Sequence, residues 1–166
     1  QRDDIFRRDK RLVCMDVDST FVKGELIDEL ASLVGAKEKV AQITARAMRG
    51  ELDFAAALRE RVALLKGLDA AILEDIYASR VSLMPGAATL VATMRRHGAH
   101  CALVSGGFSF FSERIAARLH FDSQQANTLE IVDGKLAGSV REPILGREAK
   151  LASLKRLTRA LQLAPS

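Results

Sequence analysis

Short apolar runs and stretches with helical spacing alternate along this chain, and their order predicts its elements. The stretch RLVCMDV, residues 11–17, is short, largely apolar and bounded by charge. This pattern is typical of a strand buried on both faces of a parallel sheet. A second strand of the same kind is expected at HCALV, residues 100–104. Two such strands with helical segments between them indicate an α/β protein.

After Gly24 the apolar residues recur at the three-to-four-residue spacing of helices. We predict four helices between this glycine and Ser82. Asp53 is expected to cap the third helix, which Gly67 ends, and Asp69 to cap the fourth. The sequence therefore predicts an all-helical insertion directly after the first strand.

The C-terminal half returns to alternating helices and strands. A helix that stops at Gly98 precedes the second strand, and another helix follows it. The stretch NTLEIVDGKLAGSV, residues 127–140, predicts a hairpin around Asp133 and Gly134, since Asp-Gly readily takes the positive φ angles of a two-residue turn. A last helix is expected over residues 147–161.

These elements predict a parallel α/β sheet with a helical cap inserted after its first strand. The core is expected to comprise residues 1–23 and 83–166, and the cap residues 24–82. A chain of 166 residues with 48% hydrophobic content is long and apolar enough to bury a core of this size.

Composition then indicates where in the cell the protein works. No apolar run approaches the roughly 20 residues that span a bilayer, and the charged start lacks the apolar core of a signal peptide. Cys14 and Cys101 lie in apolar runs, where they are interpreted as small buried hydrophobes rather than a disulfide. We therefore expect a cytoplasmic protein without a membrane partner.

The formal net charge of +4 raises the question of a nucleic-acid partner. Such a partner requires basic residues collected on one face. The densest basic cluster is interleaved with acids and has no stacking aromatics beside it. It consists of Arg7, Arg8, Lys10 and Arg11, among Asp3, Asp4 and Asp9. We interpret it as a solvated leader and expect no nucleic-acid binding.

Candidate chemistry begins at CMDVDST, where Asp16 and Asp18 leave the carboxyl end of the first strand. Open α/β sheets bind ligands at this edge, and residues i and i+2 of an extended segment point the same way. Two carboxylates in one pocket repel each other unless a cation or a proton is shared between them. One would then serve as an ionised nucleophile and the other as an acid and base. The alternative is that the two aspartates merely end a strand and cap a turn.

The second strand leads into Ser105, Gly106 and Gly107, which offer a hydroxyl and unobstructed backbone N–H groups to an anion. This turn is not a serine-hydrolase elbow, because Leu103 occupies the first glycine position of that motif. Lys150, in the last helix, carries an ammonium suited to offsetting the charge of a phosphoryl group. Each of these two features is weak evidence when taken alone.

Other catalytic classes are excluded by spacing. Neither cysteine is followed six residues later by arginine, as a cysteine phosphatase requires, and there is no G-x-x-x-x-G-K phosphate-binding loop. His97, His100 and His120 share no metal-ligand spacing.

Taken together, DVDST, SGG and the late lysine resemble the first three motifs of haloacid-dehalogenase-like phosphatases. Within them, the chain resembles the phosphoserine phosphatase family over nearly its whole length from about residue 11. The stretches that carry this resemblance are MDVDSTFVKGELIDELA, AMRGELDFAAALRERVALLKGL, LVSGGFSFF and ANTLEIVDGKLAGSV.

The resemblance implies a two-step, Mg²⁺-dependent phosphoryl transfer from phosphoserine. Asp16 would attack phosphorus, and Asp18 would protonate the departing serine oxygen and then deprotonate water. The Asp16 carboxylate and the Asp18 backbone carbonyl would hold the magnesium ion. Ser105 and Gly106 would bind the phosphoryl oxygens, and Lys150 would offset their charge.

The resemblance also implies substrate contacts in the cap. Phe54 and Arg61 are seven residues apart, hence on one face of a helix. Arg61 would pair with the substrate carboxylate and Glu25 with its ammonium. For Phe54 core packing is an alternative, and for Glu25 a favourable acid in a first helical turn.

One departure from the family concerns a fourth motif, a GDGxND-like acidic loop that supplies a further magnesium ligand. The sequence ends at Ser166, 16 residues after Lys150, and contains no such loop; it also begins with Gln1 rather than Met. We therefore expect residues 1–166 alone to bind magnesium weakly, to turn over little and to self-associate through the exposed edge of the first strand. Two other functions stay open, namely an inactive relative that binds phosphoserine or phosphate, and a phosphotransferase to an acceptor other than water.

Overall fold

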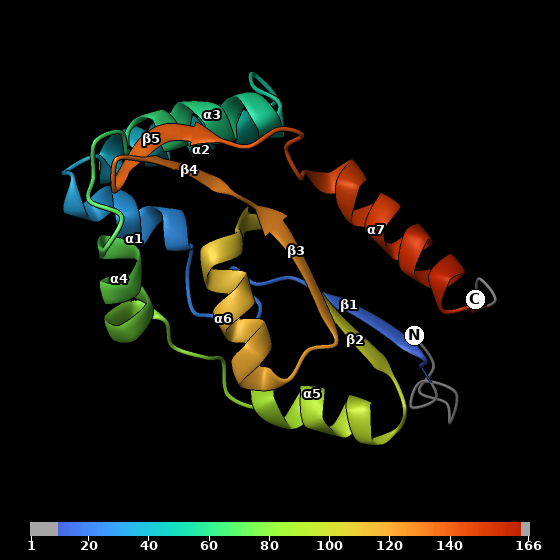
Figure 1. Cartoon of the computed structure of the whole chain (residues 1–166). Coiled ribbons are helices and arrows are strands. Elements are labelled where there is room, and N and C mark those ends of the chain that lie inside the picture. Colours follow the sequence, from blue (N-terminus) through green and yellow to red (C-terminus); the bar gives the residue numbers. More distant parts are fainter. Residues whose placement is uncertain (1–9, 164–166) are drawn as a thin grey trace.

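The computed structural model describes residues 10–163, which form an α/β protein built around a parallel sheet (Figure 1). The sheet has the strand order β1-β2-β3, with strands Leu12–Met15, His100–Phe108 and Ser123–Asn127. β1 pairs in parallel with β2, from Leu12 opposite His100 to Met15 opposite Leu103. The two predicted strands are thus present, and the end of β1 lies beside Leu103 of β2, just before the Ser-Gly-Gly segment.

Helices cover both faces of this sheet. α5 (Ala87–Arg96) and α6 (Ser109–Leu119) pack on one face, and α7 (Arg147–Ala160) lies across the other (Figure 1). The side chains of β2 alternate accordingly. Leu103 joins the cluster that contains residues of α5 and α6, whereas Val104 packs with Leu157 of α7.

Four helices lie between β1 and α5, as predicted. They are α1 (Leu26–Leu33), α2 (Lys37–Met48), α3 (Phe54–Ala63) and α4 (Ile72–Arg80). Asp53 caps α3 as expected, since its Oδ1 accepts a hydrogen bond of 2.7 Å from the Ala56 N–H. Asp69 differs from the prediction, because it accepts from the N–H of Ala71 and so closes the turn before α4 rather than the first turn of the helix.

The predicted hairpin is confirmed as β4 (Leu129–Val132) and β5 (Lys135–Val140). Asp133 and Gly134 in its turn have φ angles of 50° and 74°. The hairpin forms a sheet of its own that docks on the helical insertion. Three backbone hydrogen bonds of 2.8 Å make this junction: Gly67 N to Leu136 O, Leu136 N to Leu68 O, and Ala70 N to Gly134 O.

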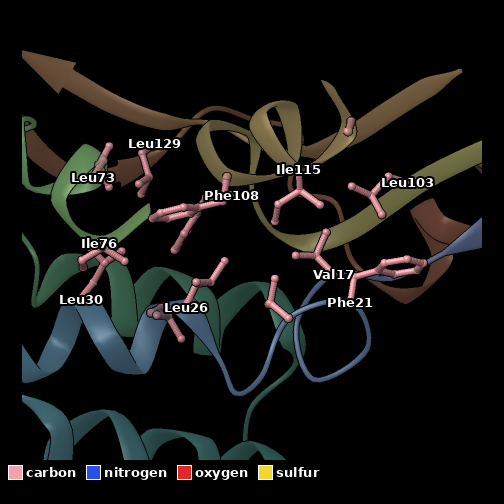
Figure 2. Packing of buried hydrophobic residues seen from close by; sticks show 14 of the residues in the cluster. Val17, Phe21, Leu26, Leu30, Leu73, Ile76, Leu103, Phe108, Ile115 and Leu129 are labelled. Atoms are coloured by element: carbon pink, nitrogen blue, oxygen red, sulfur yellow. The ribbon is translucent and has the colours of Figure 1, made fainter. Parts of the chain in front are cut away.

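One large hydrophobic cluster extends from the sheet into the insertion and the hairpin (Figure 2). Its members include Val17 after β1, Leu103 of β2 and Ile115 of α6. Leu30, Leu73 and Ile76 join it from the insertion, and Leu129 from the hairpin. The separate buried cluster inside the insertion is small and contains Ala31, Ala36 and Val40. The insertion therefore shares its main core with the rest of the molecule.

The strands differ from the sequence-based expectation in three respects. Leu12, Val13 and Cys14 of β1 are half-buried rather than buried, since β1 pairs only with β2 among the described residues. β2 continues through the Ser-Gly-Gly segment to Phe108 instead of ending at Val104. β3 was not predicted, because SQQAN lacks the apolar residues that mark a buried strand.

Both cysteines are free thiols, with Cys101 buried and Cys14 half-buried. Within residues 10–163, no helix has the length and apolar character needed to cross a membrane. Most of the charged leader, including Arg7, Arg8 and the acids among them, lies outside the described residues.

Candidate active site

A single cavity of about 170 Å³ gathers all the candidate residues at the carboxyl ends of β1 and β2. The insertion contributes side chains from α1 and α3, and α7 contributes Lys150. The candidate residues that line it are Asp16, Asp18, Glu25, Phe54, Arg61, Ser105, Gly106 and Lys150. Residues from five separate stretches of the sequence therefore meet at one place.

Asp16, the residue after β1, is half-buried with its carboxylate held from two sides. Its Oδ1 accepts a hydrogen bond of 2.9 Å from the N–H of Val17. Its Oδ2 forms an ion pair with the ammonium of Lys150 in the first turn of α7. The lysine predicted to face a phosphoryl group thus also offsets the charge of the aspartate that would attack it.

Asp18 lies deeper, under the start of the insertion. Its Oδ1 accepts a hydrogen bond of 3.0 Å from the N–H of Leu26, the first residue of α1. Burial raises the pKa of Asp18 to about 6, and the charges of Glu25 and Asp16 add to the rise, while hydrogen bonds from Leu26 and Ser105 oppose it. A carboxyl with this pKa can both give and take a proton near neutral pH.

The Ser-Gly-Gly segment packs directly against this acid. Ser105 is buried, and its Oγ accepts a hydrogen bond of 2.9 Å from the N–H of Gly107. A Cβ at position 107 would overlap Oδ2 of Asp18. The second glycine of the motif therefore provides room for the Asp18 carboxylate, a function that the sequence pattern did not indicate.

The insertion brings three candidate side chains to the opposite wall. Burial lowers the pKa of Arg61, whereas the acidic side chains of Glu25, Asp28 and Asp18 act in the other direction. Glu25 precedes α1 but makes no side-chain capping hydrogen bond there. Phe54 is 40% exposed and therefore differs from a core phenylalanine. This wall combines a cation, an anion and an aromatic ring.

The acidic residues of the site are oxygen donors of the kind that magnesium prefers. Asp16 and Asp18 are two residues apart and line the same cavity. Within residues 10–163, no group of three or more His, Cys, Asp or Glu side chains is placed to hold a metal ion. The described part of the chain therefore fits magnesium in the chemistry of its donors and offers two aspartates for it.

Asn127 is a residue of the site region that sequence analysis missed. It is buried at the end of β3, and its Nδ2 donates to the carbonyl oxygens of Gly106 at 2.8 Å and Leu145 at 3.2 Å. Its Oδ1 accepts from the N–H of Leu145 at 2.7 Å. One amide thus joins the Ser-Gly-Gly segment to the residues that lead into α7, a link that no spacing in a single sequence reveals.

The site thus combines two aspartates, a Ser-Gly-Gly segment and a lysine at a parallel sheet beneath a helical insertion. This combination is typical of a class of phosphoryl-transfer hydrolases. The chain belongs to the haloacid dehalogenase-like hydrolase family, whose model matches residues 13–166.

Among individual proteins, the chain is similar to several phosphoserine phosphatases. It is 51% identical over 148 residues to phosphoserine phosphatase SerB2 of Mycobacterium tuberculosis, a match that covers 89% of this chain and 36% of that protein. It is 44% identical over 160 residues to the phosphoserine phosphatase of Archaeoglobus fulgidus, covering 96% of this chain and 46% of that protein. The chain thus spans less than half the length of these relatives.

Solved structures of the same kind share the fold. A phospho-aspartyl intermediate analogue of phosphoserine phosphatase superposes with a TM-score of 0.86 at 37% identity, covering 93% of this chain and 74% of that one. A substrate-bound phosphoserine phosphatase complex also gives a TM-score of 0.86, at 36% identity, covering 93% of this chain and 73% of that one. The α/β architecture expected from the sequence is therefore confirmed.

Proposed function

We propose that this protein acts as a Mg²⁺-dependent phosphoserine phosphatase, which hydrolyses O-phospho-L-serine to L-serine and phosphate as the last step of serine biosynthesis. The single observation that supports it most is the convergence of all eight candidate residues on one cavity. Relatives that are 44% to 51% identical and carry this name support the choice of substrate.

In the first step, an oxygen of the Asp16 carboxylate attacks phosphorus, and the bond from phosphorus to the serine oxygen breaks. The product on the protein is an aspartyl phosphate. Lys150, which already contacts Asp16, stabilises the negative charge that develops on the phosphoryl oxygens. Ser105 and Gly106 hold those oxygens at the end of β2.

Asp18 moves the protons in both steps. Its protonated carboxyl gives a proton to the departing serine oxygen, and the carboxylate left behind removes a proton from the water that attacks phosphorus. The bond between phosphorus and the Asp16 oxygen then breaks, which releases phosphate and regenerates the Asp16 carboxylate. A pKa of about 6 supports this double role, since neither form of the group is strongly disfavoured near neutral pH.

Magnesium would be held by the Asp16 carboxylate and the Asp18 backbone carbonyl. When bound, it supplies positive charge that offsets the negative charge of the phosphoryl group. The oxygen donors at this edge of the sheet support its assignment.

Substrate choice is assigned to the insertion. We propose residues 24–82 as a cap over a core formed by residues 1–23 and 83–166. Arg61 pairs with the carboxylate of the serine moiety and Glu25 with its ammonium, while Phe54 packs over the site. The opposite charges of the two side chains suit a zwitterionic amino acid.

The proposed function also implies the partners of the protein and its place in the cell. The substrate is a small molecule, and we place the reaction in the cytoplasm, which the two free thiols support. No nucleic acid or membrane takes part. Self-association through β1 stays a prediction, supported by the edge of this strand that has no partner among the described residues.

The covalent mechanism is tested by Asp16→Asn in the full-length protein. Removal of the anionic oxygen removes the nucleophile while the shape is nearly preserved, so phosphate release from phosphoserine should fall to background. Near-normal turnover would contradict the mechanism. Added alcohols or homoserine separate the alternatives: phosphorylated acceptors indicate a phosphotransferase, and binding of phosphoserine without any product indicates an inactive relative.

The substrate assignment is tested by Arg61→Ala. If Arg61 binds the substrate carboxylate, phosphoserine hydrolysis should lose far more activity than hydrolysis of an aryl phosphate that lacks this group. The expected difference in kcat/KM is about 10-fold or more, the cost of a lost charge-assisted hydrogen bond. Arg59→Ala on the same helix is the matched control, because Arg59 lies outside the cavity. Equal losses on both substrates would indicate a structural arginine.

A further inference from the structure

The ring of Phe54 rests on the backbone of two glycines that come from different parts of the chain. Phe54 begins α3, Gly106 belongs to the Ser-Gly-Gly segment, and Gly146 directly precedes α7. A Cβ at position 106 would lie 2.9 Å from Cζ of Phe54. A Cβ at position 146 would lie 3.0 Å from its Cδ1. Both distances are shorter than ordinary carbon contacts, so a side chain at either position would push the ring away from the backbone.

Gly146 has no conformational reason to be glycine. Eight of the eleven glycines have positive φ, whereas Gly146 has φ −106° and ψ −159°, extended backbone that any residue adopts. The three nearest atoms to a Cβ there all belong to the Phe54 ring. The missing side chain at this position therefore serves the close approach of Phe54.

The two glycines are also fixed relative to each other. Asn127 is buried and hydrogen-bonds to the carbonyl of Gly106 and to both the N–H and the carbonyl of Leu145, the residue before Gly146. Gly146 in turn accepts the N–H of Lys150 at 3.2 Å. The surface under the ring is therefore anchored by a satisfied buried amide and does not retreat easily when a side chain is added.

The position of the ring bears on the cavity. Phe54 lines it together with Gly106 and Lys150, and the cavity has a volume of about 170 Å³. The ring belongs to the insertion, and the surface under it belongs to β2 and the start of α7. The distance between ring and backbone therefore determines how closely Phe54 encloses this side of the cavity.

We propose that Gly146 is a specificity-determining residue, which lets Phe54 close against the backbone and so favours small phosphomonoesters over bulky ones. This inference rests on the proposed function, because phosphoserine is its small substrate. A Cβ at position 146 would lift the ring by a few tenths of an ångström and loosen the site. Small substrates would then lose their contact with the Phe54 ring, whereas large substrates would still reach it.

The test compares Gly146→Ala, Phe54→Ala and the double variant, with phosphoserine and p-nitrophenyl phosphate as small and bulky substrates. Since a 1 Å misplacement costs about 10²-fold, we expect Gly146→Ala to raise KM for phosphoserine by about 3- to 10-fold with little change in kcat. The kcat/KM for p-nitrophenyl phosphate should stay constant or rise. In the Phe54→Ala background, Gly146→Ala should have no further effect on either substrate.

Gly146→Ser is the control for the capping of α7. Serine is a good N-cap whereas alanine is a poor one, yet both carry a Cβ. Under the proposal, Gly146→Ser behaves like Gly146→Ala. Recovery of wild-type kinetics in Gly146→Ser would assign the effect to capping, and equal losses on both substrates in Gly146→Ala would assign it to folding. Either result overturns the proposal.

A readout without turnover separates this inference from the proposed function. Gly146→Ala should lower the Tm more in the wild-type background than in the Phe54→Ala background, where only its effect on the capping of α7 remains. If phosphoserine is not a substrate, the proposed function fails. The inference is then decided by the dependence of the Tm shift on Phe54, and by the activity of Gly146→Ala on alkyl phosphates of increasing size. Additive shifts in Tm together with unchanged size preference would overturn it.

Discussion

Asp18, the proposed acid and base, also carries a cost to stability. The pKa of this carboxyl rises from 3.8 to about 6 on folding, chiefly because it is buried. Between these values the native state binds more protons than the unfolded state, so the group lowers the free energy of unfolding as pH rises through this range. Above pH 6 the whole penalty is present, up to about 3 kcal/mol.

Asp18→Asn should therefore stabilise the metal-free protein at pH 7.5 and have little effect at pH 4. The amide keeps an oxygen that can accept the Leu26 N–H, so the start of α1 is retained. Urea unfolding in chelator at several pH values measures the difference. Asp133→Asn, in the exposed hairpin turn, is the matched control and should show no such trend. A pH-independent difference for Asp18→Asn would contradict the burial of its charge.

At the scale of elements, α3 delivers both Phe54 and Arg61 and depends on its N-cap. Asp53 is exposed, so the hydrogen bond from the Ala56 N–H is its main role in the fold. Asp53→Ala should lower the free energy of unfolding by about 1 kcal/mol, while Asp53→Ser should restore most of it. Denaturant unfolding measures both variants. A loss that serine does not recover would mean that the charge of Asp53 matters more than its capping.

How far the sequence predicts an element depends on whether its signal is local. The hairpin was predictable because Asp133-Gly134 specifies its turn, and α3 because Asp53 specifies its start. β3 was not predictable, since its residues Gln124 and Gln125 are satisfied by Ser112 of α6 and Ser153 of α7, partners distant in sequence. Because these partners accept or donate hydrogen bonds, β3 can carry polar side chains although α6 and α7 cover it.

The residues of the candidate site also differ in whether their signal in the sequence is local. Asp16 and Ser105 stand in short motifs near strand ends, and the family resemblance singled out Lys150, so their meeting at one cavity could be expected from the sequence. The contacts of Asn127 and Gly146 could not be predicted, because they form only where α3, β2, β3 and the start of α7 meet. Packing between elements carries this information, and a single sequence does not display it.

At the scale of the whole molecule, two kinds of polar contact join the insertion to the rest, in addition to the shared hydrophobic cluster. Exposed ion pairs connect Arg59 to Glu142 at 2.7 Å and Arg114 to Glu74. The second kind is the backbone junction between the hairpin and residues 67–70. Exposed ion pairs contribute little because water and salt screen them. Of these two polar contacts, the backbone junction should therefore contribute more to stability.

A comparison of variants tests this ranking. A double-mutant cycle on Arg59→Ala and Glu142→Ala should give a coupling below about 1 kcal/mol that decreases with added salt. Gly138→Ala should cost more, about 1 to 3 kcal/mol, because Gly138 has φ 80° and a Cβ there would lie 2.8 Å from Cβ of Lys66. Urea unfolding measures both. A larger effect from the ion pair would reverse the ranking.

The shared hydrophobic cluster also limits how the family can be recombined. Because Leu30, Leu73 and Leu129 belong to one cluster, helices exchanged between two relatives would meet a foreign hairpin and a foreign sheet surface. A working chimera has to transfer residues 24–82 together with residues 129–140, two segments separated in the gene but contiguous in space. Evolution by module exchange would face the same requirement, so the substrate preference of this fold is expected to change by point substitution more readily than by swapping its helices.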